Sequence, residues 1–348
     1  MTPAAARFLE LTGATLPVVQ APMANFAGIE LAIAAIGAGA VGSLPCAMLM
    51  PEQAIEQARA VRAAVTGPLN LNFFCHHLGP APDESGWRAL LAPFYADEEV
   101  APPRAPAPLR RPFDAAMAEA VEAIRPEIVS FHFGLPEPAL LDRVRATGAR
   151  IFGNATNGLE AGYLIAAGCD AIVAQGFEAG GHAGYFLTGH RPVGTAALVH
   201  QIAVMTAIPV IAAGGITDAA AARAMILLGA GAVQVGTGYL LAPEAWTSAV
   251  HRACLANSGA EDSVFTNLFS GRLARGLRNR LIEALGAEHG AAPPFPYAST
   301  GLAPLRAKAE ADGRGDYSPL WAGQGAGFAV PEAAAAITRR LGEAALEA

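Results

Sequence analysis

The chain contains 348 residues, of which 53% are hydrophobic and 15% are charged, so it can bury a large core and is not disordered as a whole. Its 23 basic and 30 acidic residues give a net charge of −7, which argues against a nucleic-acid backbone as the main ligand but allows a small anion. No signal-peptide pattern, membrane-length apolar run or paired cysteine spacing is found in it. We therefore expect a cytoplasmic protein with four free cysteines and neither a nucleic-acid nor a membrane partner.

Short β-rich segments alternate with alanine-rich helical segments along residues 1–257. We expect strands at 18–23, 41–45, 69–75, 128–134, 151–155, 171–175, 209–213 and 232–236, with helical patterning that includes 51–65, 138–146, 158–167 and 218–228. Repeated βα units with uninterrupted apolar strands predict an α/β fold of the (β/α)8 TIM barrel type. The rival is an open doubly wound sheet, whose glycine-rich turn normally follows the first strand; here that strand ends in Pro22-Met23.

Two stretches interrupt this rhythm. Residues 79–112 are rich in proline, contain Trp87, Phe94 and Tyr95, and are too long for an ordinary barrel loop. We expect them to form a lid insertion after the third strand. Residues 258–348 lack the βα rhythm, and we expect a C-terminal extension of helices and loops that packs on the barrel and the substrate site.

Glycines gather after the seventh and eighth expected strands, in Gly214-Gly215 and in Gly236-Thr237-Gly238. Glycine lets the backbone approach an anion closely, and the loops after these two strands are the usual phosphate site of such a barrel. The placement predicts a phosphate group of a substrate or cofactor there. The alternative is that these glycines only form tight turns.

Neutral amides end two other strands. Asn72 and Gln175 project from the third and sixth strands, where an amide can both donate to and accept from the edge of an isoalloxazine ring. The segment Ala21-Pro22-Met23 would supply main chain and an apolar wall beside that ring. Together with the phosphate turns, this favours flavin mononucleotide (FMN) as the cofactor. The alternative is that the two amides only cap loops.

A histidine lies between glycines in the long loop after the sixth strand, within Gly180-Gly181-His182. We interpret this backbone as free to place the imidazole against a ligand, so His182 is the expected catalytic or substrate-orienting residue. An exposed loop histidine is the alternative. His132 ends the fourth strand and is a second candidate for the pocket, whereas metal-ligand and serine-nucleophile motifs are absent from the sequence.

Several segments together resemble the nitronate monooxygenases, in particular their class I branch. They are Gln20-Ala21-Pro22-Met23, Asn70-Leu71-Asn72-Phe73-Phe74, Ser130-Phe131-His132-Phe133-Gly134, the glycine–histidine loop from Gln175, Ala213-Gly214-Gly215-Ile216, Gln234-Val235-Gly236-Thr237 and Leu320-Trp321-Ala322-Gly323-Gln324. The resemblance implies an FMN-containing barrel that oxidises alkyl nitronates, or nitroalkanes, with O2 to a carbonyl compound and nitrite. No metal is implied.

The resemblance also implies roles for individual residues. His182 matches the active-site histidine. Cofactor contacts are expected for Ala21, Met23, Asn72, Gln175, Gly180, Gly181, Gly214, Gly215, Gln234, Gly236, Thr237 and Gln324. The substrate pocket is expected to include Pro22, Tyr95, His132 and Tyr297, and the region that ends at Lys308 resembles one that supplies tyrosine and lysine side chains.

Three alternative functions remain open at this point. The first is an FMN-dependent NAD(P)H:quinone reductase or enoyl-thioester reductase, which shares the phosphate loops. The second is a barrel that acts on a phosphorylated substrate without flavin. The third is a flavin-binding protein without catalytic activity.

Overall fold

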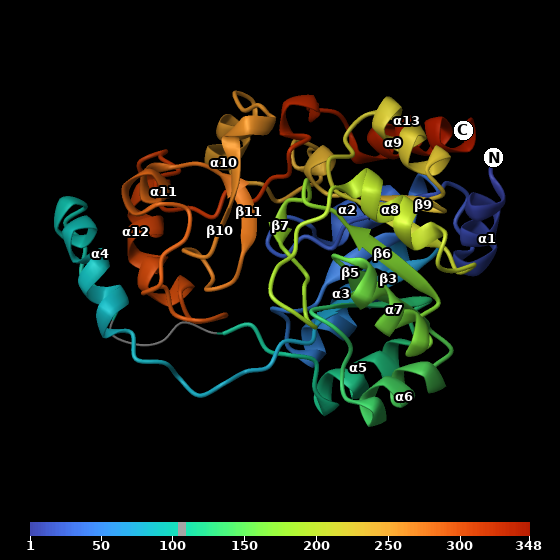
Figure 1. Ribbon diagram of the computed structural model, residues 1–348, viewed down its shortest axis with the longest axis horizontal. Helices are drawn as coiled ribbons and strands as arrows, with labels where there is room; N and C mark the ends of the chain where they lie inside the picture. The colour runs from blue at the N-terminus through green and yellow to red at the C-terminus, as the bar shows by residue number, and fades with distance from the viewer. Residues whose placement is uncertain (104–108) are drawn as a thin grey trace.

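The computed structural model describes residues 1–103 and 109–348 (Figure 1). Its 8-stranded parallel sheet has the order β1-β9-β8-β6-β5-β4-β3-β2. Hydrogen bonds from Val41 N to Val18 O and from Gln20 N to Val41 O join β1 to the start of β2, so the sheet closes on itself. The strands are β1 Val18–Gln20, β2 Gly42–Pro45, β3 Leu69–Phe74, β4 Ile128–His132, β5 Arg150–Ala155, β6 Ala171–Gln175, β8 Val210–Ala213 and β9 Ala232–Val235. The predicted TIM barrel is confirmed.

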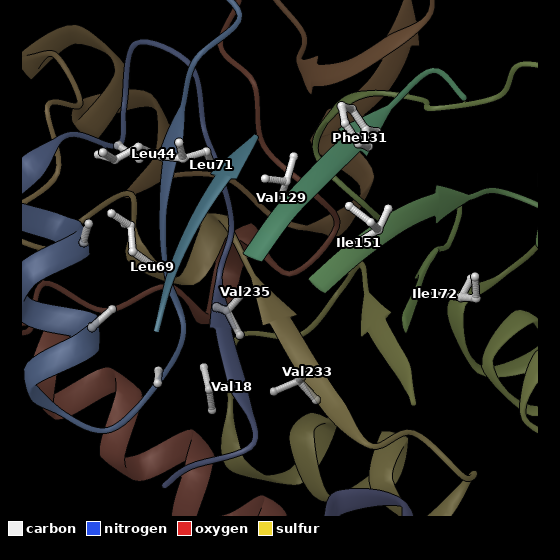
Figure 2. Close-up of a cluster of buried hydrophobic side chains, with 14 of the residues drawn as sticks. Val18, Leu44, Leu69, Leu71, Val129, Phe131, Ile151, Ile172, Val233 and Val235 are labelled. Atoms are coloured by element: carbon white, nitrogen blue, oxygen red, sulfur yellow. The ribbon is translucent and has the colours of Figure 1, made fainter. Parts of the chain in front are cut away.

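Both faces of the barrel strands are buried, as their unbroken apolar sequences predicted. Neighbouring residues on a strand point to opposite faces, so Val18 packs against the surrounding helices while Val19 packs inside the barrel with Phe8. Figure 2 shows the outward-facing set, which includes Leu71, Val129 and other strand residues. Full burial of one such side chain stabilises the fold by about 1.5–3 kcal/mol.

Helices surround the barrel (Figure 1). They are α2 Ile29–Gly37, α3 Pro51–Ala64, α5 Ala115–Ile124, α6 Pro138–Ala146, α7 Gly158–Ala166, α8 Thr195–Ala203, α9 Ala219–Leu227 and α13 Ala334–Leu346, while α1 Pro3–Thr12 contributes Phe8 to the interior. Asp114, Asn157 and Asp218 begin α5, α7 and α9 by accepting hydrogen bonds from backbone N–H groups of the first turn. Helix α13 packs against α9 and α2, so the end of the chain completes the helical layer.

The insertion and the extension pack together. We call this unit the small lobe: helix α4 (Ser85–Asp97) with residues 263–321, which contain β10 Ser263–Thr266, β11 Ala274–Leu277, α11 Arg280–Leu285 and α12 Ser299–Ala311. Trp87 of α4 is fully buried, and its indole N–H donates to Ala298 O at 3.2 Å. The expectation of helices and loops alone was wrong here, since β10 and β11 pair antiparallel. The short helix α10 (Ala249–Leu255) precedes the small lobe.

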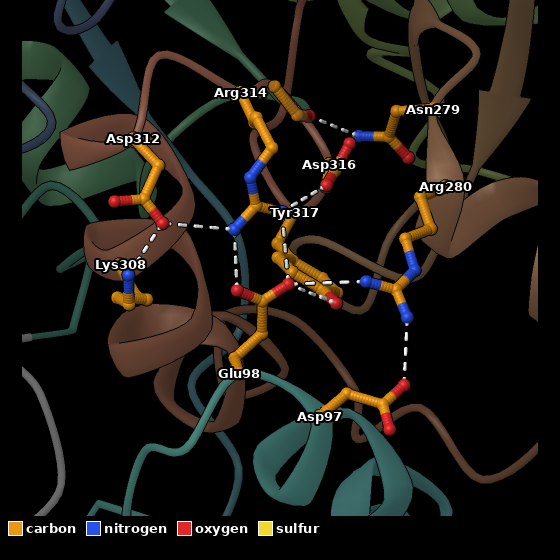
Figure 3. Close-up of polar contacts among 10 residues, drawn as sticks. Asp97, Glu98, Asn279, Arg280, Lys308, Asp312, Arg314, Asp316 and Tyr317 are labelled. Atoms are coloured by element: carbon orange, nitrogen blue, oxygen red, sulfur yellow. Dashed lines mark hydrogen bonds and ion pairs between the residues drawn. The ribbon is translucent and has the colours of Figure 1, made fainter.

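A carboxylate just after α4 joins the two parts of the small lobe (Figure 3). The side chain of Glu98 is 5% exposed and lies 2.6 Å from Arg314 Nη2 and 3.2 Å from Arg280 Nη1. The hydroxyl of Tyr317 donates to the same carboxylate at 3.1 Å. Hydrogen bonds from Arg314 lower the pKa of Glu98.

None of the described helices is both long and apolar enough to cross a bilayer.

Candidate active site

A cavity opens where the barrel strands end. It is bordered by the residues that follow β1, β8 and β9, by the ends of β3 to β6, and by Trp321 of the small lobe. Most of the predicted site residues meet here. The cavity lining includes Ala21, Pro22, Met23, Asn72, His132, Gln175, Gly180, Gly181, His182, Gly214, Gly215, Gln234, Gly236 and Thr237. Strand ends of a TIM barrel are where this fold binds its ligands.

The turn after β8 borders the cavity and has a backbone that requires glycine. Gly214 has φ +127° and Gly215 has φ +71°, which are conformations that favour glycine. A Cβ on Gly214 would lie 2.7 Å from Thr195 Oγ1 and 2.9 Å from Ala179 N. Thr217 also borders the cavity, and its Oγ1 is buried without a hydrogen-bond partner among the described residues. A narrow cradle with an unused hydroxyl fits the phosphate end of a nucleotide cofactor.

The backbone around His182 is held in a sheet. Gly181 and His182 form the short strand β7 (Gly181–His182), which pairs antiparallel with β11, with Ala274 opposite His182. Our interpretation of this loop as free backbone was therefore wrong. Segments almost a hundred residues apart in the sequence pair here, and no local pattern near His182 indicates that pairing.

Side chains at the ends of barrel strands β4 and β6 form hydrogen bonds with the backbone of the glycine–histidine loop. Gln175 Nε2 donates to His182 O at 2.8 Å, and Gln175 Oε1 accepts from Gly184 N at 2.8 Å and from Asn154 Nδ2 at 3.2 Å. His132 Nε2 also donates to His182 O, at 3.2 Å. Gln175 thus lines the cavity, but both polar atoms of its amide form hydrogen bonds with the backbone of the glycine–histidine loop. Asn72 likewise donates to Ser130 Oγ, at 2.9 Å.

A serine from the small lobe orients the His182 ring. Ser270 Oγ donates its single proton to Arg272 O at 3.1 Å, so it accepts from His182 Nε2, which lies 2.9 Å away. The hydrogen-bond network therefore assigns the ring proton to Nε2 and leaves Nδ1 with the lone pair. The sequence did not indicate Ser270, because it lies in a segment without periodicity.

The imidazole of His182 is neutral at physiological pH. Burial moves its pKa well below the usual range, and the positive charges of Arg110 and Arg272 add to that shift, as does any charge on His132. Burial likewise lowers the pKa of His132 to about 3. A neutral ring has one lone pair with which to accept a proton or a hydrogen bond, and it adds no charge to the cavity.

Aromatic side chains enclose His182. Its ring centroid lies 5.2 Å from that of Phe295, 5.7 Å from Trp321, 6.0 Å from Phe133 and 6.1 Å from Phe74. Phe295 and Trp321 come from the small lobe, and Trp321 also lines the barrel cavity. Of these two, only Trp321 lay in a segment that the sequence singled out.

Three predicted site residues do not line the cavity. Tyr95 is 4% exposed within the small lobe, where its hydroxyl donates to Gly301 O. Tyr297 donates to Gly79 O at 2.8 Å, which ties the extension to the insertion. Gln324 contacts the glycine–histidine loop through its backbone, since its N–H donates to Glu178 O at 2.9 Å. The expected pocket positions of the two tyrosines were therefore wrong, and Lys308 pairs with Asp312 instead of facing the cavity.

Comparisons with known proteins agree with this architecture. The family model described as nitronate monooxygenase matches residues 6–338. The chain is 38% identical over 344 residues to a nitronate monooxygenase from Pseudomonas aeruginosa, covering 97% of this chain and 98% of that protein. It is 38% identical over 341 residues to a nitronate monooxygenase from Paraburkholderia phytofirmans, covering 96% of this chain and 93% of that protein.

A solved structure extends the agreement to three dimensions. Nitroalkane oxidase from Streptomyces ansochromogenes is 30% identical, has a TM-score of 0.87, and the match covers 98% of each chain. The family model and the two relatives confirm the resemblance seen in the sequence motifs. The chain therefore belongs to the nitronate monooxygenase family, a family of flavin-dependent oxidoreductases.

Proposed function

We propose that this protein holds FMN in the barrel cavity and oxidises small alkyl nitronates with O2 to a carbonyl compound and nitrite. The observation that carries the proposal is a neutral, rigidly held imidazole, that of His182, in the same cavity as the glycine turns after β8 and β9. Those turns suit a phosphate, and the imidazole suits an anion that needs orientation but no proton removal.

The residues present fit FMN. Gly214, Gly215 and Gly236 would hold the phosphate, with the unused hydroxyl of Thr217 beside them. The segment 21–23 would pack along the isoalloxazine ring. Bound FMN supplies the redox chemistry, because it accepts the electrons that the nitronate gives up. The protein supplies binding, orientation and exclusion of water.

The chemical state of His182 favours nitronates over nitroalkanes as substrates. A neutral nitroalkane must first lose an α-proton, and an imidazole whose pKa is far below the usual value is a weak base for that step. A nitronate has already lost this proton. His182 then only needs to orient the substrate, through Nδ1 or through the face of its ring.

The test is a visible spectrum of the purified protein followed by nitrite release from ethyl nitronate under air. We expect a yellow protein that releases nitrite. We expect His182→Asn to retain the flavin but to lose more turnover with nitroethane than with ethyl nitronate, while His200→Asn on the exposed surface of α8 serves as the matched control. Equal losses with both substrates would remove His182 from proton transfer.

Two outcomes would contradict the proposed function itself. Rapid anaerobic bleaching of the flavin by NADH or NADPH, without nitrite release from nitronates, would favour the reductase alternative. A colourless protein that does not take up FMN would favour a flavin-free barrel.

We also propose a cytoplasmic location, which the four free cysteines support because reducing compartments preserve thiols.

A further inference from the structure

One cation lies in the wall of the cavity. Among the described residues that line it, Arg110 is the side chain that stays charged at neutral pH. The other titratable groups in that lining are His132 and His182, whose pKa values burial lowers far enough to leave them neutral. The cavity therefore has a positive charge that comes from the insertion between β3 and α5.

Arg110 lacks a carboxylate partner within the part of the chain that the structure describes. None of the described ion pairs includes it. The neighbouring residues 104–108 contain only arginine, alanine and proline, so they add no acid. Burial lowers the pKa of Arg110, and Arg306 adds a second positive charge in the same direction. A partly buried guanidinium in such surroundings is stabilised by an anion that enters the cavity.

Arg110 and His182 both lie near the ring of Phe295. Its Cζ lies 5.9 Å from the ring centroid of Phe295, and the same ring lies 5.2 Å from that of His182. His76 Nε2 donates to Arg110 O at 3.2 Å, which anchors the backbone of this residue to the segment after β3. The guanidinium of Arg110 and the imidazole of His182 thus both border the cavity and both lie near the ring of Phe295.

We propose that Arg110 pairs with the negative charge of the substrate and makes the site select the anionic nitronate over the neutral nitroalkane. The inference rests on the proposed function and assigns its charge selectivity to a residue of the insertion. The two oxygens of a nitronate match two N–H groups of a guanidinium, as those of a carboxylate do. Because His182 is neutral, the described lining offers no other charged group for this role.

The test compares Arg110→Met and Arg110→Lys with Arg111→Met, whose exposed neighbouring arginine provides the matched control. Nitrate is the binding probe, since it is planar and anionic like the nitronate group but is not oxidised. Titration calorimetry of the flavin-loaded protein gives its Kd. We expect Arg110→Met to raise that Kd by roughly 10- to 100-fold, the range for one charge-assisted hydrogen-bonded contact. We expect Arg110→Lys to restore part of the affinity and Arg111→Met to change nothing.

Turnover provides the second readout. In Arg110→Met, kcat/KM for ethyl nitronate falls by a similar factor, mainly through KM, whereas kcat/KM for neutral nitroethane changes less than about threefold. Unchanged nitrate affinity in Arg110→Met, or equal losses with both substrates, would overturn the inference. Nitrate binding needs no turnover, so a protein that binds nitrate through Arg110 but releases no nitrite would refute the proposed function and leave the anion site intact.

Discussion

The amide of Gln175 offers a direct test of how the barrel holds the glycine–histidine loop. The change Gln175→Glu keeps the shape of the side chain and preserves Oε1, which accepts from Gly184 N and Asn154 Nδ2. It replaces the Nε2 donor, 2.8 Å from His182 O, by a second acceptor oxygen. Two acceptors then face each other in a mostly buried position.

The cost follows from the lost hydrogen bond and the unfavourable contact, which together amount to about 2–4 kcal/mol at pH 8. Unfolding entropy of about 2.1 cal/mol/K per residue corresponds to about 1.4 °C of Tm per kcal/mol for a chain of 348 residues. We therefore expect Tm to fall by about 3–5 °C. Turnover falls as well, because the His182 carbonyl loses its shorter hydrogen bond and keeps only the one from His132 Nε2 at 3.2 Å.

The pH dependence distinguishes this mechanism from a general packing defect. The introduced carboxyl can regain a donor by taking up a proton, so its folded-state pKa is raised above the unfolded value. A raised pKa stabilises the fold at low pH and loses that contribution as pH increases. The Tm deficit should thus shrink at pH 5 and be largest at pH 8, as measured by calorimetry beside the exposed control Gln201→Glu. A deficit that is absent, or equal at both pH values, would refute the reasoning.

Three further predictions concern the turns, the small lobe and the titration of the site. Gly214→Ala strains a backbone at φ +127° and should weaken flavin retention at least ~10-fold in dialysis, whereas Gly148→Ala, at φ +89° with nothing within 4 Å of the added Cβ, should retain it. Glu98→Gln should cost about 1–3 kcal/mol in urea unfolding at pH 7. Because the folded-state pKa of Glu98 is lowered, this difference should shrink as the pH falls below the unfolded-state pKa of about 4.3, and a constant difference would contradict the ion-pair origin. The plot of kcat/KM for ethyl nitronate against pH should show no histidine titration between about pH 6 and 9, because the pKa of His182 is lowered well below the usual range. A titration in that range that disappears in His182→Asn would show that His182 is not neutral there.

The barrel was predictable because its signals are local. Strands such as Ala171–Gln175 are apolar runs bounded by turn residues, and helices such as α9 begin at a capping side chain. Gly214 and Gly215 were recognisable as a turn at the strand ends for the same reason, since a βα turn needs only a few adjacent residues. Strand order and closure then follow from the repeat of the unit.

The rest of the site depends on pairings that no local pattern encodes. Ser270, Phe295 and Arg110 belong to the extension and the insertion, where neither helical nor strand periodicity marks which side chains turn inward. Tyr95 shows the opposite error: the family resemblance implied a position in the substrate pocket, yet its ring is buried in the small lobe. The aromatic composition of the insertion indicates that it packs against other parts of the protein. Which part it packs against depends on contacts with residues far away in the sequence.

The small lobe has a consequence for how the protein is made. Its defining contacts join residues 182 to 219 positions apart, as between Glu98 and Arg280 or Glu98 and Tyr317. At a synthesis rate of roughly 5–20 residues per second, α4 leaves the ribosome roughly 10–40 seconds before its partners. During that interval Trp87 and Leu91 have no apolar surface of the small lobe to cover them. The nascent chain therefore passes through a stage in which the barrel strands are complete but the insertion still exposes apolar side chains, and the cavity gains Trp321 of its wall only after that stage.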